Sequence, residues 1–268
     1  MSIVIHQDLT LAGDEQDVTN CNPRIGYDTV VTAGTVTSDQ GAATRINLAN
    51  PSTYLKWTAD NNGTQSVGAT LVAARTVNYY GIAAHNLGTA SAVITFQSSI
   101  NGVDWTDVTD GVLLQNDTAM IEEFEDQFAA YYRILIEGAT VAPSIGVLYI
   151  GRMLRMQRRI YVGHSPFVLQ RRTVVSSGKS ENGQFLGRVV RSTTYETKVQ
   201  MQNLTPTWVR QRLDPFLALA ADTPFFWSWR PCEYPTEVGF AWTKNDPSVS
   251  NQRPNGMMDF NMDIQGIR

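Results

Sequence analysis

The sequence predicts an all-β protein of two units: a jelly-roll β-sandwich, then a second β-sandwich that carries one short α-helix. Turn-forming residues separate short, alternating apolar runs roughly every ten residues, which is typical of all-β folds. Only one stretch, about residues 206–221, repeats apolar residues at three- and four-residue steps, as an amphipathic helix does. The charge also changes sign: residues 1–150 hold 16 acidic and 5 basic side chains, and residues 151–268 hold 9 and 16. We therefore expect two units that meet near residue 150.

Residues 1–25 are expected to form an extended arm. Ile3-Val4-Ile5 is a short apolar run, and the acidic polar segment Asp14-Glu15-Gln16-Asp17 follows it. An arm of this kind packs on its own unit or on a neighbouring subunit, and the sequence leaves both open. Cys21 and Cys232 match no metal-ligand spacing, so two free thiols in a reduced compartment are favoured over a disulfide. The sequence has no leader pattern and no apolar run of about 20 residues, so we expect a soluble protein made in the cytosol.

Residues 26–150 are expected to form the first sandwich. Turn formers such as Asn101-Gly102 and Glu137-Gly138 separate its strands. The expected strands cover residues 29–37, 44–47, 53–58, 69–74, 79–85, 92–98, 112–115, 131–136 and 144–149. This many short strands favours a jelly-roll sandwich.

Four segments of the first unit, at residues 79–88, 98–108, 131–136 and 145–150, follow one another in a distinctive order. They include the turn Asn101-Gly102-Val103-Asp104-Trp105 and the late strand Tyr132-Arg133-Ile134. This order resembles discoidin (coagulation factor 5/8 C-domain-like) sandwiches. The resemblance implies a discoidin-like fold for this unit. Such sandwiches serve as binding modules, appendages and spacers, so it implies no single function.

Residues 151–166 form a basic connector, and the second unit is expected to cover residues 167–268. A strand at residues 192–201 precedes the helix, which we expect at about 206–221. Thr205 is a suitable N-cap and Pro206 suits the first helical position, whereas Pro215 predicts a kink. The aromatic strand 225–229 comes next, and a polar loop at 244–256 leads to a last strand at 257–265.

The basic connector, the turn Gly163-His164-Ser165-Pro166 and the block from residue 205 to residue 229 together resemble minor tail and distal tail proteins of long-tailed bacteriophages. The resemblance implies a tail-tube or belt-like β domain that assembles as a homo-oligomeric ring, a hexamer being favoured. It implies a structural, non-enzymatic virion protein of the tail tip that joins the tail tube to the tip and hub, made in the host bacterial cytoplasm. In the familiar members the extra sandwich follows the ring domain, whereas here it precedes it.

Arginines and large aromatics of the second half are the candidate subunit-interface residues. Clustered arginines also suit nucleic acid, but the protein is acidic overall and has few interleaved aromatics, so ion pairing with the acidic half or a neighbouring copy is favoured. No membrane and no sequence-specific nucleic acid is expected as a partner. The candidates are Arg152, Arg155, Arg158, Arg159, Trp208, Trp227 and Trp229.

A carbohydrate-binding module for host adsorption is the alternative function, with a host-surface glycan as partner. Aromatic side chains of the first unit can stack on sugars, although the same residues commonly fill sandwich cores, and the core role is favoured. The candidate carbohydrate-binding residues are Trp57, Tyr80, His85 and Trp105.

No catalytic residue, metal ligand or cofactor is predicted. The acidic run Glu122-Glu123-Phe124-Glu125-Asp126 is expected on a solvated turn, where adjacent carboxylates lack the separation and raised pKa of a glycosidase pair. Gly178-Lys179-Ser180 lacks the upstream glycine of a phosphate-binding loop, because position 173 is Thr173. His85 and His164 are expected in turns, as satisfied side chains rather than ligands.

Overall fold

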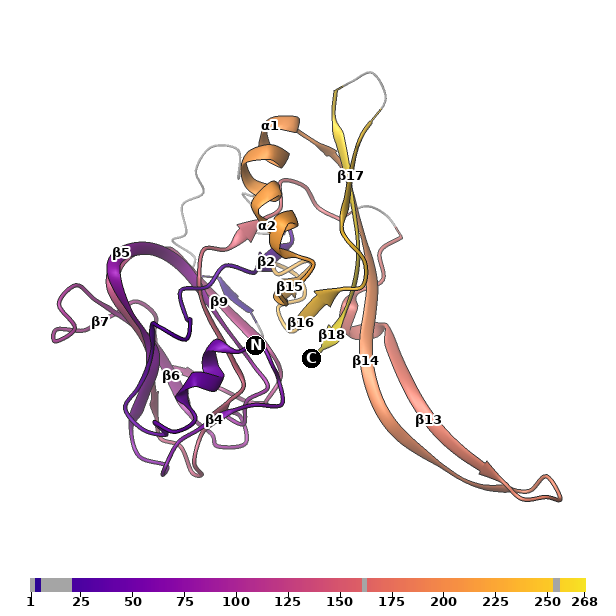
Figure 1. The fold of residues 1–268 in the computed structure, drawn as a ribbon, viewed down its shortest axis with the longest axis horizontal. Helices are drawn as coiled ribbons and strands as arrows, with labels where there is room; N and C mark the ends of the chain where they lie inside the picture. The colour runs from indigo at the N-terminus through magenta and orange to yellow at the C-terminus, as the bar shows by residue number, and fades with distance from the viewer. Residues whose placement is uncertain (1–2, 6–20, 161–162, 253–255) are drawn as a thin grey trace.

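The computed structural model describes residues 3–5, 21–160, 163–252 and 256–268. Two eight-stranded sheets and one two-stranded sheet make up nearly all of its regular structure. The described residues contain one short α-helical segment besides brief 3₁₀ helices, so the predicted all-β class is confirmed (Figure 1). None of the helices in these ranges is long and apolar enough to cross a membrane.

The first sheet has the central order β11-β5-β9-β6-β7, with β1, β3 and β8 attached to β9, β5 and β6. All of its pairs are antiparallel except β1 with β9. Its strands are β1 (Ile3–Ile5), β3 (Val36–Ser38), β5 (Gln65–Ala83), β6 (Val93–Ser99), β7 (Thr106–Asp107), β8 (Val112–Leu113), β9 (Met120–Glu137) and β11 (Val147–Gly151). The small second sheet pairs β4 (Trp57–Thr58) with β10 (Ser144–Ile145).

Two strands are much longer than predicted. β5 merges the expected strands 69–74 and 79–85, and the β5–β9 register shifts between Thr70 and Arg75 and again between Val77 and Tyr79. Both strands bend at these irregularities (Figure 1). Val67 and Tyr80, from opposite halves of β5, therefore lie in the same hydrophobic cluster, and one folded sheet encloses much of the core.

The acidic run at residues 122–126 is not a solvated turn, which corrects the prediction. It lies inside β9, where Glu122 and Glu123 are buried. Alternation alone did not reveal this strand, since its charged residues also face the protein interior. The expected strand 44–47 is also wrong, because this segment is the 3₁₀ helix η2 (Arg45–Ala49).

The second eight-stranded sheet has the order β12-β2-β15-β16-β18-β14-β13, with β17 attached to β18. Its strands are β2 (Arg24–Gly26), β12 (Leu154–Arg155), β13 (Arg171–Lys179), β14 (Phe185–Leu204), β15 (Phe225–Ser228), β16 (Val238–Thr243), β17 (Ser248–Asn251) and β18 (Met258–Ile267). A short 3₁₀ helix, η3 (Phe167–Leu169), precedes β13. β17 lies where a polar loop was expected. β2 comes from the segment before the first sandwich, so the chain enters the second sheet, leaves it, and returns.

The helical segment begins at Pro206, as predicted, with Thr205 at the N-cap position. Thr205 makes no side-chain capping bond; instead its hydroxyl accepts a hydrogen bond from Gln157 Nε2 at 2.9 Å. α1 (Pro206–Trp208) continues into a π-helical turn, η4 (Val209–Leu213), and then into α2 (Asp214–Leu219). The backbone N–H of Asp214 bonds the Val209 carbonyl five residues back. This wider turn comes just before Pro215, which has no N–H to offer the carbonyl four residues back.

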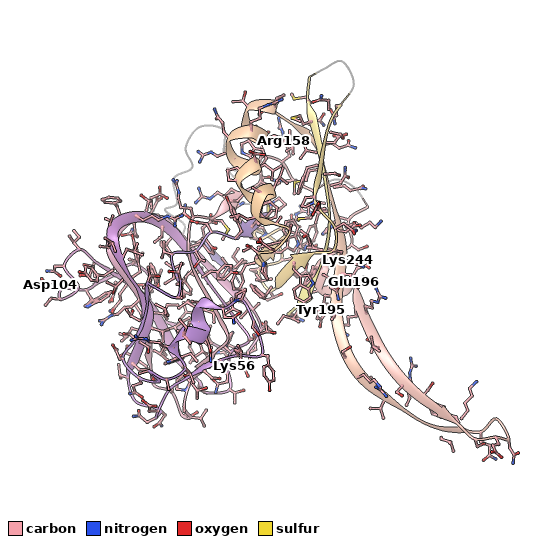
Figure 2. The ribbon with its side chains drawn as sticks, viewed as in Figure 1. Lys56, Asp104, Arg158, Tyr195, Glu196 and Lys244 are labelled. Carbon is pink, nitrogen blue, oxygen red and sulfur yellow. A yellow bond between two sulfur atoms is a disulfide. The ribbon has the colours of Figure 1, made fainter. Side chains whose placement is uncertain are left out.

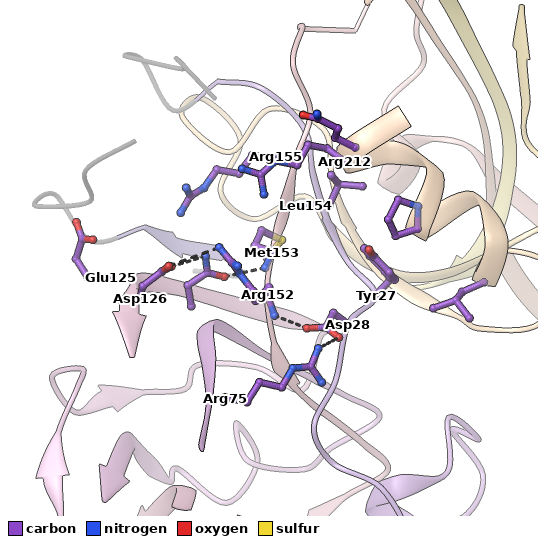
Figure 3. Close-up of a pocket in the computed structure, with 14 residues that line it drawn as sticks. Tyr27, Asp28, Arg75, Glu125, Asp126, Arg152, Met153, Leu154, Arg155 and Arg212 are labelled. Carbon is purple, nitrogen blue, oxygen red and sulfur yellow. Dashed lines mark hydrogen bonds and ion pairs between the residues drawn. The ribbon is translucent and has the colours of Figure 1, made fainter. Parts of the chain in front are cut away.

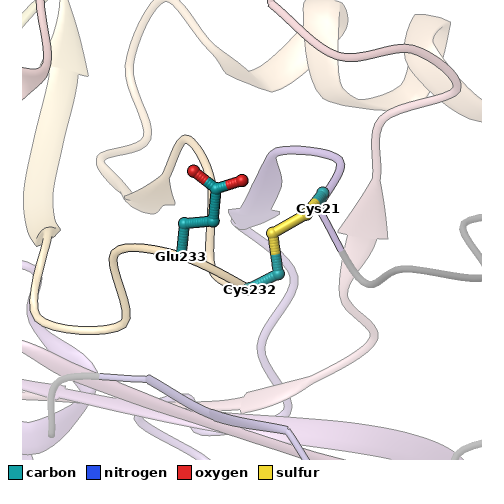
Figure 4. A group of neighbouring side chains, drawn as sticks. All are labelled: Cys21, Cys232 and Glu233. Carbon is teal, nitrogen blue, oxygen red and sulfur yellow. A yellow bond between two sulfur atoms is a disulfide. The ribbon is translucent and has the colours of Figure 1, made fainter.

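Cys21 and Cys232 form a disulfide, with their Cα atoms 4.9 Å apart, so the expectation of two free thiols is corrected. The bond joins the segment before β2 to the loop between β15 and β16 (Figure 4). β1 approaches the same loop, where Ile3 N donates to Pro235 O at 2.7 Å. The acidic segment 14–17 lies outside the described residues.

A third hydrophobic cluster joins the two large sheets. Tyr79 and Ile121 of the first sheet pack with Phe226 and Phe240 of the second. Ring centroids of Tyr149 and Phe226 lie 5.5 Å apart in an edge-to-face arrangement. Gly81 faces Phe226 so closely that a Cβ there would lie 2.7 Å from the ring. The two sheets therefore share one continuous apolar contact. The domain boundaries at residues 25, 150 and 166 stay a prediction.

Candidate interaction surface

A long two-stranded ribbon is exposed along nearly its whole length. β13 pairs with β14 from Arg171–Tyr195 to Lys179–Phe185, but β18 pairs with β14 only from Tyr195 onward. Residues 171–194 therefore form a hairpin that projects from the second sheet, and no further strand of the described residues lies on either side of it (Figure 1). We call these residues the arm.

Apolar side chains of the arm point into solvent. Phe185 and Leu186 near its tip are each 68% exposed, and Val189 is 66% exposed. An isolated two-stranded hairpin is marginally stable in water, and exposed strand edges are sites of pairing with other chains. The arm thus combines open backbone edges with uncovered apolar surface.

The arm is also basic. It holds five Lys or Arg residues and one Glu. Arg188 and Arg191, together with Leu186 and Val189, line a shallow groove of about 500 Å³ along it. The predicted strand at residues 192–201 covers only the base of the arm, and alternation does not show whether a strand lies inside a sheet or projects beyond it.

Arg155 of the connector lies on the inside of the molecule. Its Nε donates to Glu123 Oε1 at 2.5 Å, while Arg24 Nε donates to Glu123 Oε2 at 3.0 Å. All three side chains are buried. Burial raises the pKa of the Glu123 carboxyl, but the charges and hydrogen bonds of Arg24 and Arg155 outweigh it, so the pKa lies below its usual value. We call these three residues the ion triad; it joins β9 of the first sheet to β2 and β12 of the second.

A cleft of about 560 Å³ lies beside the ion triad, between α2 and the connector (Figure 3). Asp28 and Arg75 meet at its floor at 2.5 Å, and Arg152 lies 3.5 Å from Asp126 at its side. The backbone N–H of Arg152 also donates to Asp28 Oδ2 at 2.8 Å. The cleft therefore holds opposite charges that already neutralise one another.

Of the other candidate interface residues, some are buried in the core and others are exposed. Trp208 and Trp227 are buried in the core of the second unit, so neither can contact another copy. Arg152, Arg158 and Arg159 are exposed. Trp229 is half-buried, stacks on Tyr234 with ring centroids 5.3 Å apart, and donates its indole N–H to Glu237.

Three of the four candidate carbohydrate-binding residues are also core residues. Trp57 and Tyr80 are fully buried and His85 is 4% exposed, so none of them can stack on a sugar at the surface. Tyr80 donates its hydroxyl to the buried Glu122. Trp105 alone is half-exposed, and the Arg133 guanidinium carbon lies 3.9 Å from its ring centroid.

The two described histidines make hydrogen bonds within the protein, His85 through both ring nitrogens and His164 through Nδ1. His85 Nε2 lies 2.9 Å from Thr118 O, and Leu87 N donates to His85 Nδ1 at 3.2 Å, which selects the neutral ring. Burial lowers the pKa of His85 and of His164. His164 Nδ1 lies 3.0 Å from Lys198 O. His85 therefore holds its turn together and offers no free nitrogen to a ligand.

Cys21, Cys232 and Glu233 form the one group of three potential metal ligands found in the described part of the chain. The two sulfur atoms are bonded to each other, so they are not thiolates and cannot ligate as thiolates do. Their geometry is that of a covalent link.

Comparison with known proteins gave structural likenesses only. No family model matches the sequence, and no curated protein does. A chitosan-binding module 1 derived from a chitosanase/glucanase of Paenibacillus sp. IK-5 is 20% identical; the match covers 46% of this chain and 98% of the module, with a TM-score of 0.39. The CBM32 of AlyQ in complex with 4,5-unsaturated mannuronic acid is 23% identical over 47% of this chain and 96% of that one, with a TM-score of 0.39.

A pectin-binding carbohydrate-binding module is 16% identical over 46% of this chain and 91% of its own, with a TM-score of 0.38. None of these three is a tail protein. Scores at this level leave the family and the ligand of the present chain unassigned.

Proposed function

We propose that this chain is a structural, non-enzymatic protein that assembles with copies of itself through the arm. In its most specific form, the proposal is a ring component of a bacteriophage tail tip, located in the virion tail, that connects tube to tip and carries the first sandwich outward. A hexamer is the expected ring. The observation that supports self-assembly is the arm, with Phe185, Leu186 and Val189 uncovered on an otherwise unsupported ribbon.

The physical reason is the balance between burial and exposure. Each apolar side chain that leaves water contributes about 1.5–3 kcal/mol, whereas the arm leaves several in solvent together with both strand edges. A partner that covers the arm recovers this free energy. Scattered single apolar residues need no such explanation, but the arm concentrates them on one projecting element.

The strongest polar contacts support a structural role. Glu123 is held by two arginines, and both ring nitrogens of His85 are hydrogen-bonded, one to Leu87 N in its own turn and one to Thr118 O. These titratable groups serve the fold, so they have no capacity left to activate a substrate.

Light scattering after size-exclusion chromatography tests the proposal. The wild-type chain is expected to form a defined oligomer, with mass rising with concentration until it reaches a plateau. Replacing residues 176–189 by Asn-Gly joins Val175 to Val190, which pair in the present hairpin, through a two-residue turn. This shortened variant should be monomeric. A wild-type chain that stays monomeric at high concentration contradicts the proposal.

Electron microscopy of the wild-type oligomer tests the specific form. Closed six-fold rings that dock on the end of a phage tail tube support the tail-tip role. Open or irregular aggregates count against it.

Carbohydrate binding is the second candidate, and the observation that favours it is the half-exposed Trp105 beside Arg133. Aromatic faces with a neighbouring hydrogen-bond donor suit sugar stacking. Glycan-array binding that Trp105→Ala abolishes, while the circular dichroism spectrum is unchanged, supports it. Trp242→Ala on the distant second sheet is the matched control. An array without hits removes this candidate.

A further inference from the structure

We infer that the arm of one copy docks on an acidic loop at the opposite end of a second copy, as a head-to-tail contact. This inference rests on the proposed function and names the surface that receives the arm. The acidic loop consists of residues 100–111, which follow β6 and include β7.

The acidic loop has the same exposed character as the arm, with the opposite charge. Ile100 is 84% exposed and Val103 is 77% exposed. Asp104, Asp107 and Asp110 are also exposed beside them. The sequence contains no Lys or Arg between Arg75 and Arg133, but it contains eight acidic residues there. Three of these eight, Asp104, Asp107 and Asp110, belong to the loop, which has no basic residue of its own, while the Arg133 guanidinium lies over its Trp105.

The arm presents the complementary combination. Its groove places two guanidinium groups, Arg188 and Arg191, next to the apolar side chains of Leu186 and Val189. Arginine forms paired hydrogen bonds with carboxylates, and apolar side chains of a partner can fill the groove between them. A loop that offers Ile100 or Val103 next to Asp104 has both features.

The acidic loop is held in shape by its own hydrogen bonds. The backbone N–H groups of Val103 and Asp104 both donate to Asn101 Oδ1 at 2.9 Å. Asp107 accepts a hydrogen bond from Gln97 Nε2 at 2.6 Å. A preorganised loop loses little conformational entropy on binding, which favours it as a docking site.

One copy cannot satisfy both surfaces by itself. The acidic loop, marked by Asp104, and the tip of the arm lie at opposite ends of the longest axis of the molecule (Figure 2). In the head-to-tail contact inferred here, each copy places its arm on one neighbour and receives the arm of another on its loop, which is a heterologous contact; two copies that exchange both contacts about a two-fold axis would form a closed dimer instead. Heterologous contacts close into rings when the rotation between copies allows it. Opposite charge at the two ends favours this partner, a second copy, over an unrelated one.

Charge reversal tests the contact. Arg188→Glu with Arg191→Glu on the arm, or Asp104→Lys with Asp110→Lys on the loop, should each weaken self-association by roughly 100-fold or more, because like charges then face one another. An equimolar mixture of the two variants should recover the wild-type oligomer, since each reversed surface finds a partner of opposite sign. Arg45→Glu with Lys56→Glu changes two exposed charges elsewhere and should have no effect.

The outcomes separate the inference from the proposed function. If the wild-type chain does not self-associate, both fail. If it self-associates through the arm, but the loop variant assembles normally or the mixture fails to recover, only this inference is overturned. If the wild-type monomer instead binds a single-stranded DNA oligonucleotide and the arm variant loses that binding, the arm is a nucleic-acid site and the inference is wrong.

Discussion

Two pairs of arginines in this protein have opposite environments. Arg24 and Arg155 of the ion triad are buried, and one carboxylate bonds both. Arg188 and Arg191 of the arm are exposed, on a ribbon in which the described part of the chain pairs only β13 with β14. The first pair joins two sheets within one molecule. The second pair belongs to an element that projects away from the molecule.

The difference teaches that arginine density alone does not locate an interface. The connector (residues 151–166) and the arm are both basic in sequence, and the connector has the higher proportion of arginine. Its Arg155 is nevertheless an internal residue, because β12 pairs with β2 and lies against the acidic part of β9. Ion triads are weak evidence for stability, since desolvation offsets their attraction, but removing one member leaves uncompensated charge.

Loss of the shared carboxylate is expected to have the largest effect. Glu123→Gln should lower the free energy of unfolding by about 3–5 kcal/mol, because the two buried arginines would lose the carboxylate that they share. Urea denaturation at neutral pH measures it. Glu137→Gln, exposed on the same strand, should change the value by no more than about 0.5 kcal/mol. Equal losses in the two variants would show that the ion triad has no special role.

The disulfide is expected to have the next largest effect, since it holds the segment that carries Arg24. Replacing Cys21 and Cys232 by Ser should lower the free energy of unfolding by about 2–4 kcal/mol. Intact-mass measurement with an alkylating reagent, before and after reduction, shows whether the bond exists. Labelling of both cysteines without reduction would contradict the link.

A pair of valines on β14 compares core with arm directly. Val199→Ala should cost about 2 kcal/mol of unfolding free energy, because Val199 is fully buried. Val189→Ala, on the exposed part of the same strand, should change it by at most about 0.5 kcal/mol in the monomer. The measurement is urea denaturation at low protein concentration. A large loss for Val189→Ala would mean that the arm packs on its own molecule.

Acid should weaken the ion triad and leave the arm unaffected. Under mildly acidic conditions the loss of unfolding free energy should be smaller than the losses expected for the three sets of substitutions above. The folded pKa of Glu123 is lowered, so its contribution is fully present above the unfolded pKa of about 4.3 and is lost as pH falls through the lower folded value. Wild-type stability should therefore decline below about pH 5 more steeply than that of Glu123→Gln. Parallel curves for the two proteins would falsify the assignment.

The fold class and several elements could be read from the chain before the structure. Alternation located most strands, and helical spacing with Pro206 located the start of the helix. The predictions failed where the local residue pattern and the three-dimensional environment of a segment disagree. The acidic run of β9 resembled a turn, and its two buried glutamates are matched by residues far away in sequence, Tyr80 and Arg24.

The candidate sites show the same limit. Burial removed Trp57, Tyr80 and His85 from the surface, and it removed Trp208 and Trp227 from any interface. An aromatic residue on a strand faces the core or solvent according to the register of its neighbours, and that register depends on residues distant in the chain. The exposed residues of the arm carried no distinguishing signal, since a strand of the same pattern inside a sheet would look alike.

The sequence by itself determined the all-β class, the place of the one helical segment and the reversal of charge at mid-chain, because these follow from local periodicity and composition. Only the tertiary structure decided which charges are internal and which are free to meet another molecule. The physical reason is that burial and pairing are properties of long-range contacts: Arg24 and Glu123 lie 99 residues apart, whereas the arm is exposed because β18 pairs with β14 only from Tyr195 onward and leaves β13 as the sole partner strand among the described residues.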